Sequence, residues 1–385
     1  MTSRRTLLKG TLCGSAAALL PTVASATPGG PALELPAPAG PYPVGMRTVH
    51  LTDPARSDPW VGGVRELMLT VLYPARSVRG FSRAPQLTPG EAVVFAAYAP
   101  HVHPGLPGPG AVDWGAIRTH GYVGAPPLPG RRPVLVYSPG GGDSRTLGTG
   151  LAEDLASHGR VVVLVDHPGD ASQVELPTGM RTTVLTGPPD PATFRTMIDT
   201  RIADLRLVLD RLGDLPLAPV IDSRRVGLYG HSAGGTAAVY AACGDRRVGA
   251  VANLEGYLDL YAMPSGADRP LLLFRTDGFD GAARIDSSWA GLPGRRSLLA
   301  DANHWAFTDY GSLVPQLRTA GLVTADARAA LVGTGNPEAT LARVRRGVGT
   351  FFARQGTYRR RGASPRYFDV NLAPGAATLV RLGAR

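Results

Sequence analysis

The sequence predicts an α/β fold in which a mostly parallel central sheet carries helices on both faces. Short apolar runs of strand length recur along the chain and are separated by helical stretches. Most of these runs are apolar throughout rather than alternating, as expected of strands that are buried on both faces. The chain has 385 residues, of which 44% are hydrophobic, so it can fill the core of one large domain.

The predicted elements follow one another in a regular order. Residues 65–73 alternate and end at Pro74, as a strand does, and residues 133–137 form a short apolar run that Pro139 and glycines close. Further runs of strand length cover residues 161–165, 226–229, 248–254, 271–274 and 297–300. The clearest helix covers residues 193–212, where apolar side chains recur at spacings of three and four, at Ile198, Ile202, Leu205, Val208, Leu209 and Leu212.

The N-terminal segment predicts export from the cytoplasm. Arg4 and Arg5 precede a short apolar run that ends at Leu20, and Ala24-Ser25-Ala26 has the small-x-small pattern of a cleavage site. Residues 1–26 are therefore expected to be a twin-arginine export signal, recognised by the twin-arginine export machinery. The expected location of the mature protein is secreted or otherwise extracytoplasmic.

The remaining chain divides into a tether and a single domain. Residues 27–45 are dominated by Pro, Gly and Ala and predict a tether, and residues 46–385 predict one domain. Within it, residues 101–130 are rich in Pro and Gly and predict an insertion, which could form a rim or lid or be an ordinary surface loop. Loss of Cys13 with the export signal would leave only Cys243, which excludes an intramolecular disulfide.

The charge of the chain does not indicate a nucleic-acid partner. The formal net charge is +10, but the arginines occur singly or in pairs, and residues 359–361 are the only run of three. Such a surface is compatible with transient contact with an anionic membrane or polymer, although genome-wide composition bias explains it as well.

A candidate nucleophile lies in the segment Gly230-His231-Ser232-Ala233-Gly234. It follows the predicted strand 226–229 and precedes a small-residue stretch that reads as a helix. A serine on such a strand–turn–helix adopts a strained backbone conformation, and the residues two before and two after it must be tiny. Glycine occupies both places. The motif predicts an α/β-hydrolase fold with Ser232 as the nucleophile.

A serine hydroxyl needs a histidine base and a carboxylate that orients the base. In this fold the chain order is serine, acid, histidine, and His304 is the only histidine after Ser232. Glu255 and Asp277 both follow predicted strands at the carboxyl edge of the sheet, and Asp280 is a third choice. The residues alone leave the acid open, although the commoner place in the fold favours Asp277.

The oxyanion hole requires two backbone N–H donors. Ala233 follows the nucleophile and supplies the first, and Gly141 in the glycine-rich loop after residues 133–137 is expected to supply the second. No cofactor is implied, because the sequence lacks a phosphate-cradling loop and a dinucleotide fingerprint. No metal site is expected either, since His101 and His103 have no third ligand nearby and are expected to be exposed.

Five segments resemble the bacterial relatives of platelet-activating factor acetylhydrolase, a lipase- and esterase-like branch of the α/β-hydrolases that cleaves short acyl esters without a metal. In that family a Leu-Asp-Gly supplies the acid, and Leu254-Glu255-Gly256 occupies this slot here, so the resemblance favours Glu255. The change from Asp to Glu is a departure, and so is Pro139, where relatives often carry a histidine. The segments are RELMLTVLYP (65–74), PVLVYSPG (133–140), VVVLVDHPGDAS (161–172), GHSAGG (230–235) and HWAFTDY (304–310).

The expected function is that of a secreted serine hydrolase. It would cleave short-acyl or lipid-like carboxylic esters through an acyl-enzyme, with Ser232, His304 and Glu255 as the triad. The expected partner is a small-molecule or lipid ester. One alternative is a polyester or cutin hydrolase, and another is a non-catalytic lipid- or partner-binding protein on a hydrolase scaffold.

Overall fold

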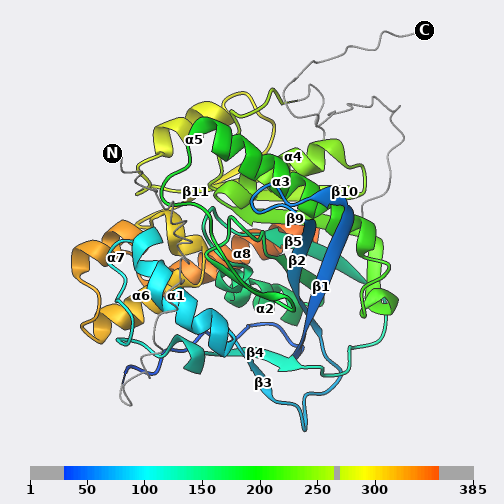
Figure 1. Ribbon diagram of the computed structural model, residues 1–385, viewed down its shortest axis with the longest axis horizontal. Coiled ribbons are helices and arrows are strands. Elements are labelled where there is room, and N and C mark those ends of the chain that lie inside the picture. The colour runs from blue at the N-terminus through cyan, green and yellow to red at the C-terminus, as the bar shows by residue number, and fades with distance from the viewer. Residues whose placement is uncertain (1–29, 264–268, 355–385) are drawn as a thin grey trace, which may run out of the picture.

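The computed structural model describes residues 30–263 and 269–354, and its centre is a ten-stranded sheet (Figure 1). The strand order is β12-β11-β10-β9-β5-β6-β2-β1-β4-β3. Strands β12 to β6 of this order run parallel to one another, while β2 is antiparallel to both β6 and β1. The strands are β1 (Val44–Ser57), β2 (Val64–Pro74), β3 (Arg83–Pro85), β4 (Arg118–Val123), β5 (Arg132–Ser138), β6 (Val161–Val165), β9 (Ile221–His231), β10 (Val248–Leu254), β11 (Leu271–Thr276) and β12 (Arg295–Leu299).

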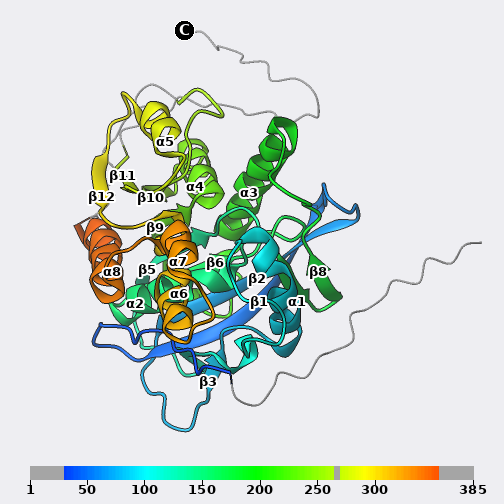
Figure 2. The ribbon, with the colours of Figure 1, turned by 90° about the vertical axis from the view of Figure 1, so that its left-hand side faces the viewer.

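Helices cover both faces of the sheet (Figure 2). Side chains alternate along each strand, so Leu135 and Tyr137 of β5 pack on one face, and Val134 and Val136 pack on the other. The first face is covered by α1 (Pro89–Val102), α2 (Thr149–Ser157), α6 (Tyr310–Thr319), α7 (Ala325–Val332) and α8 (Pro337–Arg354). The second face is covered by α3 (Pro191–Arg211), α4 (Ala233–Gly244) and α5 (Ala282–Trp289). A separate hairpin joins β7 (Gln173–Leu176) to β8 (Gly179–Thr182).

Helix α3 forms where the apolar spacing predicts a helix. Its N-cap is Asp190, whose carboxylate accepts hydrogen bonds from the amides of Ala192 and Thr193, and Pro191 occupies the first turn, where its missing N–H costs nothing. The stripe that includes Ile198 and Leu205 is buried against the sheet and α4. The helix therefore lies beside the element that follows Ser232.

The N-terminal residues differ from the predicted tether. Leu33 and Leu35 are buried in the core, and Arg345 of α8 donates hydrogen bonds to the carbonyls of Pro36 and Ala37. The prediction for residues 27–45 is therefore wrong from residue 30 onward, and residues 27–29 lie outside the described residues. A proline-rich segment lacks periodicity, yet its single leucines can still be buried.

The predicted insertion at residues 101–130 is part of the fold. It contains a short 3-10 helix at Trp114–Ala116 and the strand β4, which pairs with β1 and β3. Trp114 is buried and packs edge-on against Phe95 of α1. Because β4 extends the sheet, residues 118–123 are part of the sheet, and a rim or lid formed by the rest of the segment stays a prediction.

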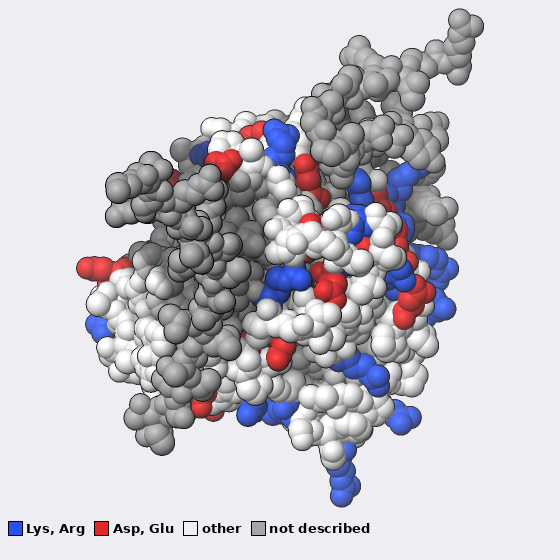
Figure 3. Space-filling view, in the orientation of Figure 1, with Lys and Arg blue, Asp and Glu red and all other residues white. Residues whose placement is uncertain are grey.

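The surface carries scattered charges. On the face that Figure 3 shows, arginine side chains stand apart and alternate with aspartate and glutamate rather than forming a single basic patch. Within residues 30–263 and 269–354, no helix has the length and apolar character needed to cross a membrane. The predicted export signal, Cys13 and residues 359–361 lie outside the described residues.

Candidate active site

Ser232 lies at a sharp turn between β9 and α4. Its φ and ψ are 52° and −124°, a left-handed conformation that a non-glycine residue adopts only under strain. Its amide donates a hydrogen bond to the carbonyl of Leu254 at 2.9 Å, which ties the turn to the end of β10. The half-buried side chain is therefore at the carboxyl edge of the sheet, ahead of the N-terminus of α4.

The glycines around Ser232 have no room for a side chain. A Cβ at Gly230 would lie 2.3 Å from the backbone of Gly234. A Cβ at Gly234 would lie 2.0 Å from the carbonyl oxygen of Ser138 and 2.4 Å from that of Pro139. A side chain at either position would force the neighbouring backbone to shift, so the undistorted turn requires glycine at both, as the motif predicts.

Glu255 lies at the end of the next strand and contacts His304. Its Oε2 is 2.9 Å from Nδ1 of His304, while its Oε1 accepts hydrogen bonds from the amide of Thr276 at 2.5 Å and from the Thr276 hydroxyl at 2.8 Å. Glu255 also has a positive φ, of 63°. Of the described non-glycine residues, only Ser232, Glu255 and Asp301 have a positive φ, and all three lie just beyond strand ends at this edge.

Asp277 does not contact the imidazole. Its two carboxylate oxygens accept hydrogen bonds from the amides of Asp301 and Ala302, at 3.0 and 3.2 Å. These residues belong to the loop between β12 and His304, so Asp277 supports the backbone of that loop. The geometry pairs the imidazole with Glu255 and leaves Asp277 in a supporting position.

His304 lies between aromatic rings in a nearly water-free position. Phe279 stacks on its ring, with centroids 4.1 Å apart and planes inclined by 15°, and its side chain is 6% exposed. His231 bonds through Nε2 to the carbonyl of His304 at 2.9 Å, which ties the loop to the end of β9. Burial lowers the pKa of His304 to about 3, although the charge of Asp143 opposes this. A neutral imidazole can accept a proton.

Burial also changes the pKa of the candidate acid, Glu255. It raises the pKa of Glu255, and the hydrogen bonds from Thr276 to its carboxylate oppose that rise. A carboxylate that is held by two donors on one oxygen keeps its other oxygen directed at Nδ1 of His304. The neutral ring then carries its proton on Nδ1 and leaves Nε2 free to accept.

The glycine-rich loop after β5 passes close to the turn at Ser232. A Cβ at Gly141 would lie 3.7 Å from the Cβ of Ala233, so the two predicted oxyanion donors lie side by side. The amide of Gly142 is engaged elsewhere, because it donates to Oδ1 of Asp170 at 3.1 Å. Gly141 and Ala233 therefore lie close together, and their role as the two oxyanion donors stays a prediction.

Three other histidines, His101, His103 and His167, lie outside the contact between Glu255 and His304. His103 is buried and bonds to Asp143 at 2.9 Å, whereas His101 is exposed, so the expectation of an exposed pair is wrong for His103. His167 is buried in a network below the glycine-rich loop. Among the described residues, no group of three or more His, Cys, Asp or Glu side chains is arranged to hold a metal.

Two residues that contact His304 or the glycine-rich loop could not be picked out with the candidate site residues. Phe279 packs on His304 from the loop after β11, and no sequence pattern announces that contact. Arg201 of α3 contacts the glycine-rich loop. A signal for Arg201 was present, because it is a charged residue within the apolar stripe of α3, three residues after Ile198 and four before Leu205.

A groove elsewhere on the molecule does not contain these residues. It has a volume of about 1010 Å³ and lies between the N-terminal residues and helices α6 and α8. Its walls include Pro36, Ser312 and Arg345. Ser312 donates its hydroxyl to the carbonyl of Asp309 and has no histidine base bonded to it. This groove therefore lies away from Ser232, which stays the predicted nucleophile.

Comparison with known proteins decides the family. No protein-family model matches the chain. A ferulic acid esterase from Streptomyces cinnamoneus has a similar structure, with a TM-score of 0.68 and 35% sequence identity, covering 84% of this chain and 92% of that protein. The chain belongs to the esterase family of α/β-hydrolases.

A curated sequence gives a second point of comparison for the esterase. It is a probable 1-alkyl-2-acetylglycerophosphocholine esterase from Arthroderma benhamiae, 28% identical over 273 residues, which are 67% of this chain and 68% of that protein. The comparisons confirm the predicted α/β-hydrolase fold and the resemblance to the relatives of platelet-activating factor acetylhydrolase. The protein is a carboxylic ester hydrolase.

Proposed function

We propose that the esterase cleaves its substrate through an acyl-enzyme on Ser232, with His304 as the base and Glu255 as the acid that orients it. The observation that carries the proposal is the 2.9 Å contact between Oε2 of Glu255 and Nδ1 of His304, at the same sheet edge as the strained turn of Ser232. A buried carboxylate on Nδ1 fixes the tautomer whose Nε2 accepts a proton.

The reaction proceeds in two stages. Oγ of Ser232 attacks the ester carbonyl carbon as Nε2 of His304 takes the hydroxyl proton, and the resulting oxyanion accepts hydrogen bonds from the amides of Gly141 and Ala233. Collapse of this intermediate expels the alcohol, which leaves with the proton from His304. Water then attacks the acyl-enzyme as His304 takes one of its protons, and the free acid leaves as His304 returns that proton to Oγ of Ser232.

The experiment is hydrolysis of short p-nitrophenyl esters by Ser232→Ala and His304→Ala. Both variants should remain folded by circular dichroism, and both should lose turnover by about 10⁴-fold or more, because members of a triad act as a unit. Full turnover in folded Ser232→Ala would overturn the assignment. Ser312→Ala is a matched control, because it removes a hydroxyl outside the site.

We further propose short-acyl or lipid-like esters as substrates. The name of one relative supports this range, since it denotes an esterase of an acetylated lipid, whereas the other relative is named as an esterase of ferulic acid, an aromatic acid. A panel of p-nitrophenyl esters graded from acetate to palmitate, with methyl ferulate beside it, measures the preference. The highest kcat/KM should fall on a short ester, and a maximum at palmitate would contradict the proposal.

A polyester or cutin substrate is tested separately, by release of soluble acids from a polymer film.

We also propose that the esterase is exported through the twin-arginine pathway and cleaved after Ala26. The arrangement of Arg4, Arg5 and the following apolar run supports this proposal. Replacing both arginines with lysine should leave the precursor in the cytoplasm, as measured by cell fractionation. Unchanged export of the double variant would refute it.

A further inference from the structure

Arg201 reaches from α3 to the loop that carries Gly141. Its side chain is completely buried, and its NH1 donates to the carbonyl of Pro139 at 2.5 Å while its NH2 donates to the carbonyl of Gly140 at 2.9 Å. Its Nε donates to Oδ2 of Asp170 at 2.5 Å. The planar guanidinium thus holds two consecutive carbonyls of the loop and one carboxylate.

Asp170 holds the same loop from the other side of Gly141. Its Oδ2 accepts from Arg201, and its Oδ1 accepts from the amide of Gly142 at 3.1 Å. The ion pair therefore fixes the peptide before Gly141 through a carbonyl and the peptide after it through an N–H. Both contacts are made inside the protein, because Arg201 and Asp170 are both buried.

The grip on Gly140 determines where the amide of Gly141 points. The carbonyl of Gly140 and the N–H of Gly141 belong to one planar trans peptide, in which these two groups point in opposite directions. With the carbonyl held on Arg201, the N–H is turned away from Arg201. Gly141 lies beside Ala233. A cationic donor on the carbonyl also polarises the peptide and strengthens its N–H as a donor.

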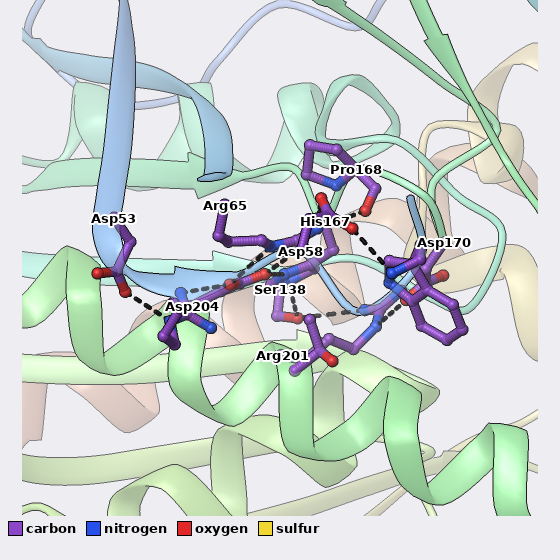
Figure 4. Close-up of polar contacts among 12 residues, drawn as sticks. Asp53, Asp58, Arg65, Ser138, His167, Pro168, Asp170, Arg201 and Asp204 are labelled. Atoms are coloured by element: carbon purple, nitrogen blue, oxygen red, sulfur yellow. Dashed lines mark hydrogen bonds and ion pairs between the residues drawn. The ribbon is translucent and has the colours of Figure 1, made fainter. Parts of the chain in front are cut away.

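In the buried network that contains Arg201, the donor and the acceptor of each hydrogen bond can be assigned. Figure 4 shows Arg65, Ser138, His167, Arg201 and Asp204 gathered in one network. Asp204 can only accept, so Nδ1 of His167, 2.9 Å away, donates to it. Burial lowers the pKa of His167 to about 4, so its ring is neutral near pH 7 and its Nε2 accepts from the hydroxyl of Ser138 at 2.9 Å. That hydroxyl in turn accepts from NH1 of Arg201 at 3.3 Å.

We propose that Arg201, together with Asp170, is a positioning residue that fixes the 140–141 peptide so that the amide of Gly141 is aimed at the oxyanion before substrate binds. The inference rests on the proposed acyl-enzyme mechanism. It assigns Arg201 a role in transition-state stabilisation rather than in substrate binding, because the oxyanion exists only after attack.

The test is Arg201→Lys, which keeps the positive charge but cannot span both carbonyls and the carboxylate. Removing one oxyanion donor costs about 10²- to 10³-fold in kcat, so a misaligned donor should cost about 10- to 100-fold. KM should change by less than about threefold, because the ground-state ester does not use the donor. Affinity for a boronic acid transition-state analogue should fall in proportion to kcat/KM, while the pH profile set by His304 stays in place.

Arg65→Lys is the matched control. Arg65 is also completely buried and ion-paired in the same network, but it donates to Asp58, Asp204 and the carbonyl of Pro168 rather than to the glycine-rich loop. We expect a similar loss of thermal stability with kcat within about threefold of wild type. Equal losses of kcat in both variants would show a merely structural role and overturn the proposal.

The remaining outcomes separate this proposal from the mechanism on which it rests. If Ser232→Ala is inactive while folded Arg201→Lys keeps kcat and analogue affinity within twofold, the positioning role alone is wrong. If Ser232→Ala retains turnover, the mechanism itself fails. Should Arg201→Lys not fold, Asp170→Asn carries the test, because its amide nitrogen would face Nε of Arg201 as a second donor. A loss of kcat without a loss of analogue affinity contradicts the proposal in either variant.

Discussion

Replacing Glu255 with glutamine tests which acid orients His304. Oε1 of Glu255 accepts two hydrogen bonds from Thr276, so a glutamine at this position keeps its carbonyl oxygen there. Its NH2 group then faces Nδ1 of His304, which must become an acceptor. The proton of the neutral ring moves to Nε2, and Nε2 can no longer take the proton of Ser232.

The magnitude follows from this change of tautomer. An aspartate-to-asparagine change in an intact serine triad lowers kcat by about 10⁴-fold. We expect a loss of about 10³- to 10⁴-fold for Glu255→Gln, which corresponds to roughly 4 to 5.5 kcal/mol of transition-state stabilisation. The fold should persist, because glutamine has almost the same volume and keeps the hydrogen bonds from Thr276.

Asp277→Asn is the matched variant. Asp277 accepts from the amides of Asp301 and Ala302, and an asparagine retains one oxygen for them. Weakening hydrogen bonds to a charged group costs about 1.5 to 3 kcal/mol of stability. Because Asp277 supports the loop backbone and not the imidazole, we expect kcat to fall by less than about tenfold.

The assay is steady-state hydrolysis of p-nitrophenyl acetate at pH 8, with circular dichroism melting curves for both variants. A larger loss of kcat in Asp277→Asn than in Glu255→Gln would refute the pairing of Glu255 with His304.

Three further predictions concern the turn, the base and the core. Gly234→Ala should lower kcat by about 10²-fold, because its Cβ would push the Ser138 carbonyl by about 1 Å, whereas Gly349→Ala, which meets no atom within 4 Å, should leave kcat unchanged. The acid limb of the pH profile of kcat/KM should lie below pH 6.5, because burial lowers the pKa of His304 and activity is lost only as the pH falls through that lowered value. Phe279→Ala should admit water to the ring and move this limb to higher pH. A wild-type midpoint at or above pH 6.5 would contradict the prediction. Arg65→Met should lower the free energy of unfolding in urea by about 3 to 5 kcal/mol, because it removes the buried guanidinium from Asp58 and Asp204. A loss below about 1 kcal/mol would show that their other partners, Arg181 and Arg56, compensate for it.

The parallel half of the sheet could be predicted closely from the sequence. Residues 161–165 and 248–254 form strands with the predicted bounds, because a run that is buried on both faces is apolar from end to end. The strand β1 was missed, since its apolar side chains are interrupted by Arg47 and by Asp53-Pro54. Helix α8 was also missed, although Val344, Val348 and Phe351 repeat at helical spacing.

The residues of the candidate site could be predicted from the sequence, whereas the choice of Glu255 as the acid came from the family resemblance and not from spacing. The order of residues along the chain identified His304 as the candidate base, and the glycines of the turn identified Ser232 as the candidate nucleophile. The choice between Glu255 and Asp277 depended on which loop brings its carboxylate to the imidazole, and that depends on tertiary contacts such as the one between Asp277 and Ala302. No spacing rule encodes such a contact.

The most direct test of the account is the site of covalent labelling. The esterase should be treated with a fluorophosphonate, and the adduct located by mass spectrometry of its peptides. The account predicts one adduct, on Ser232, and none in Ser232→Ala. An adduct on another serine, or an unlabelled protein that still hydrolyses esters, would contradict it.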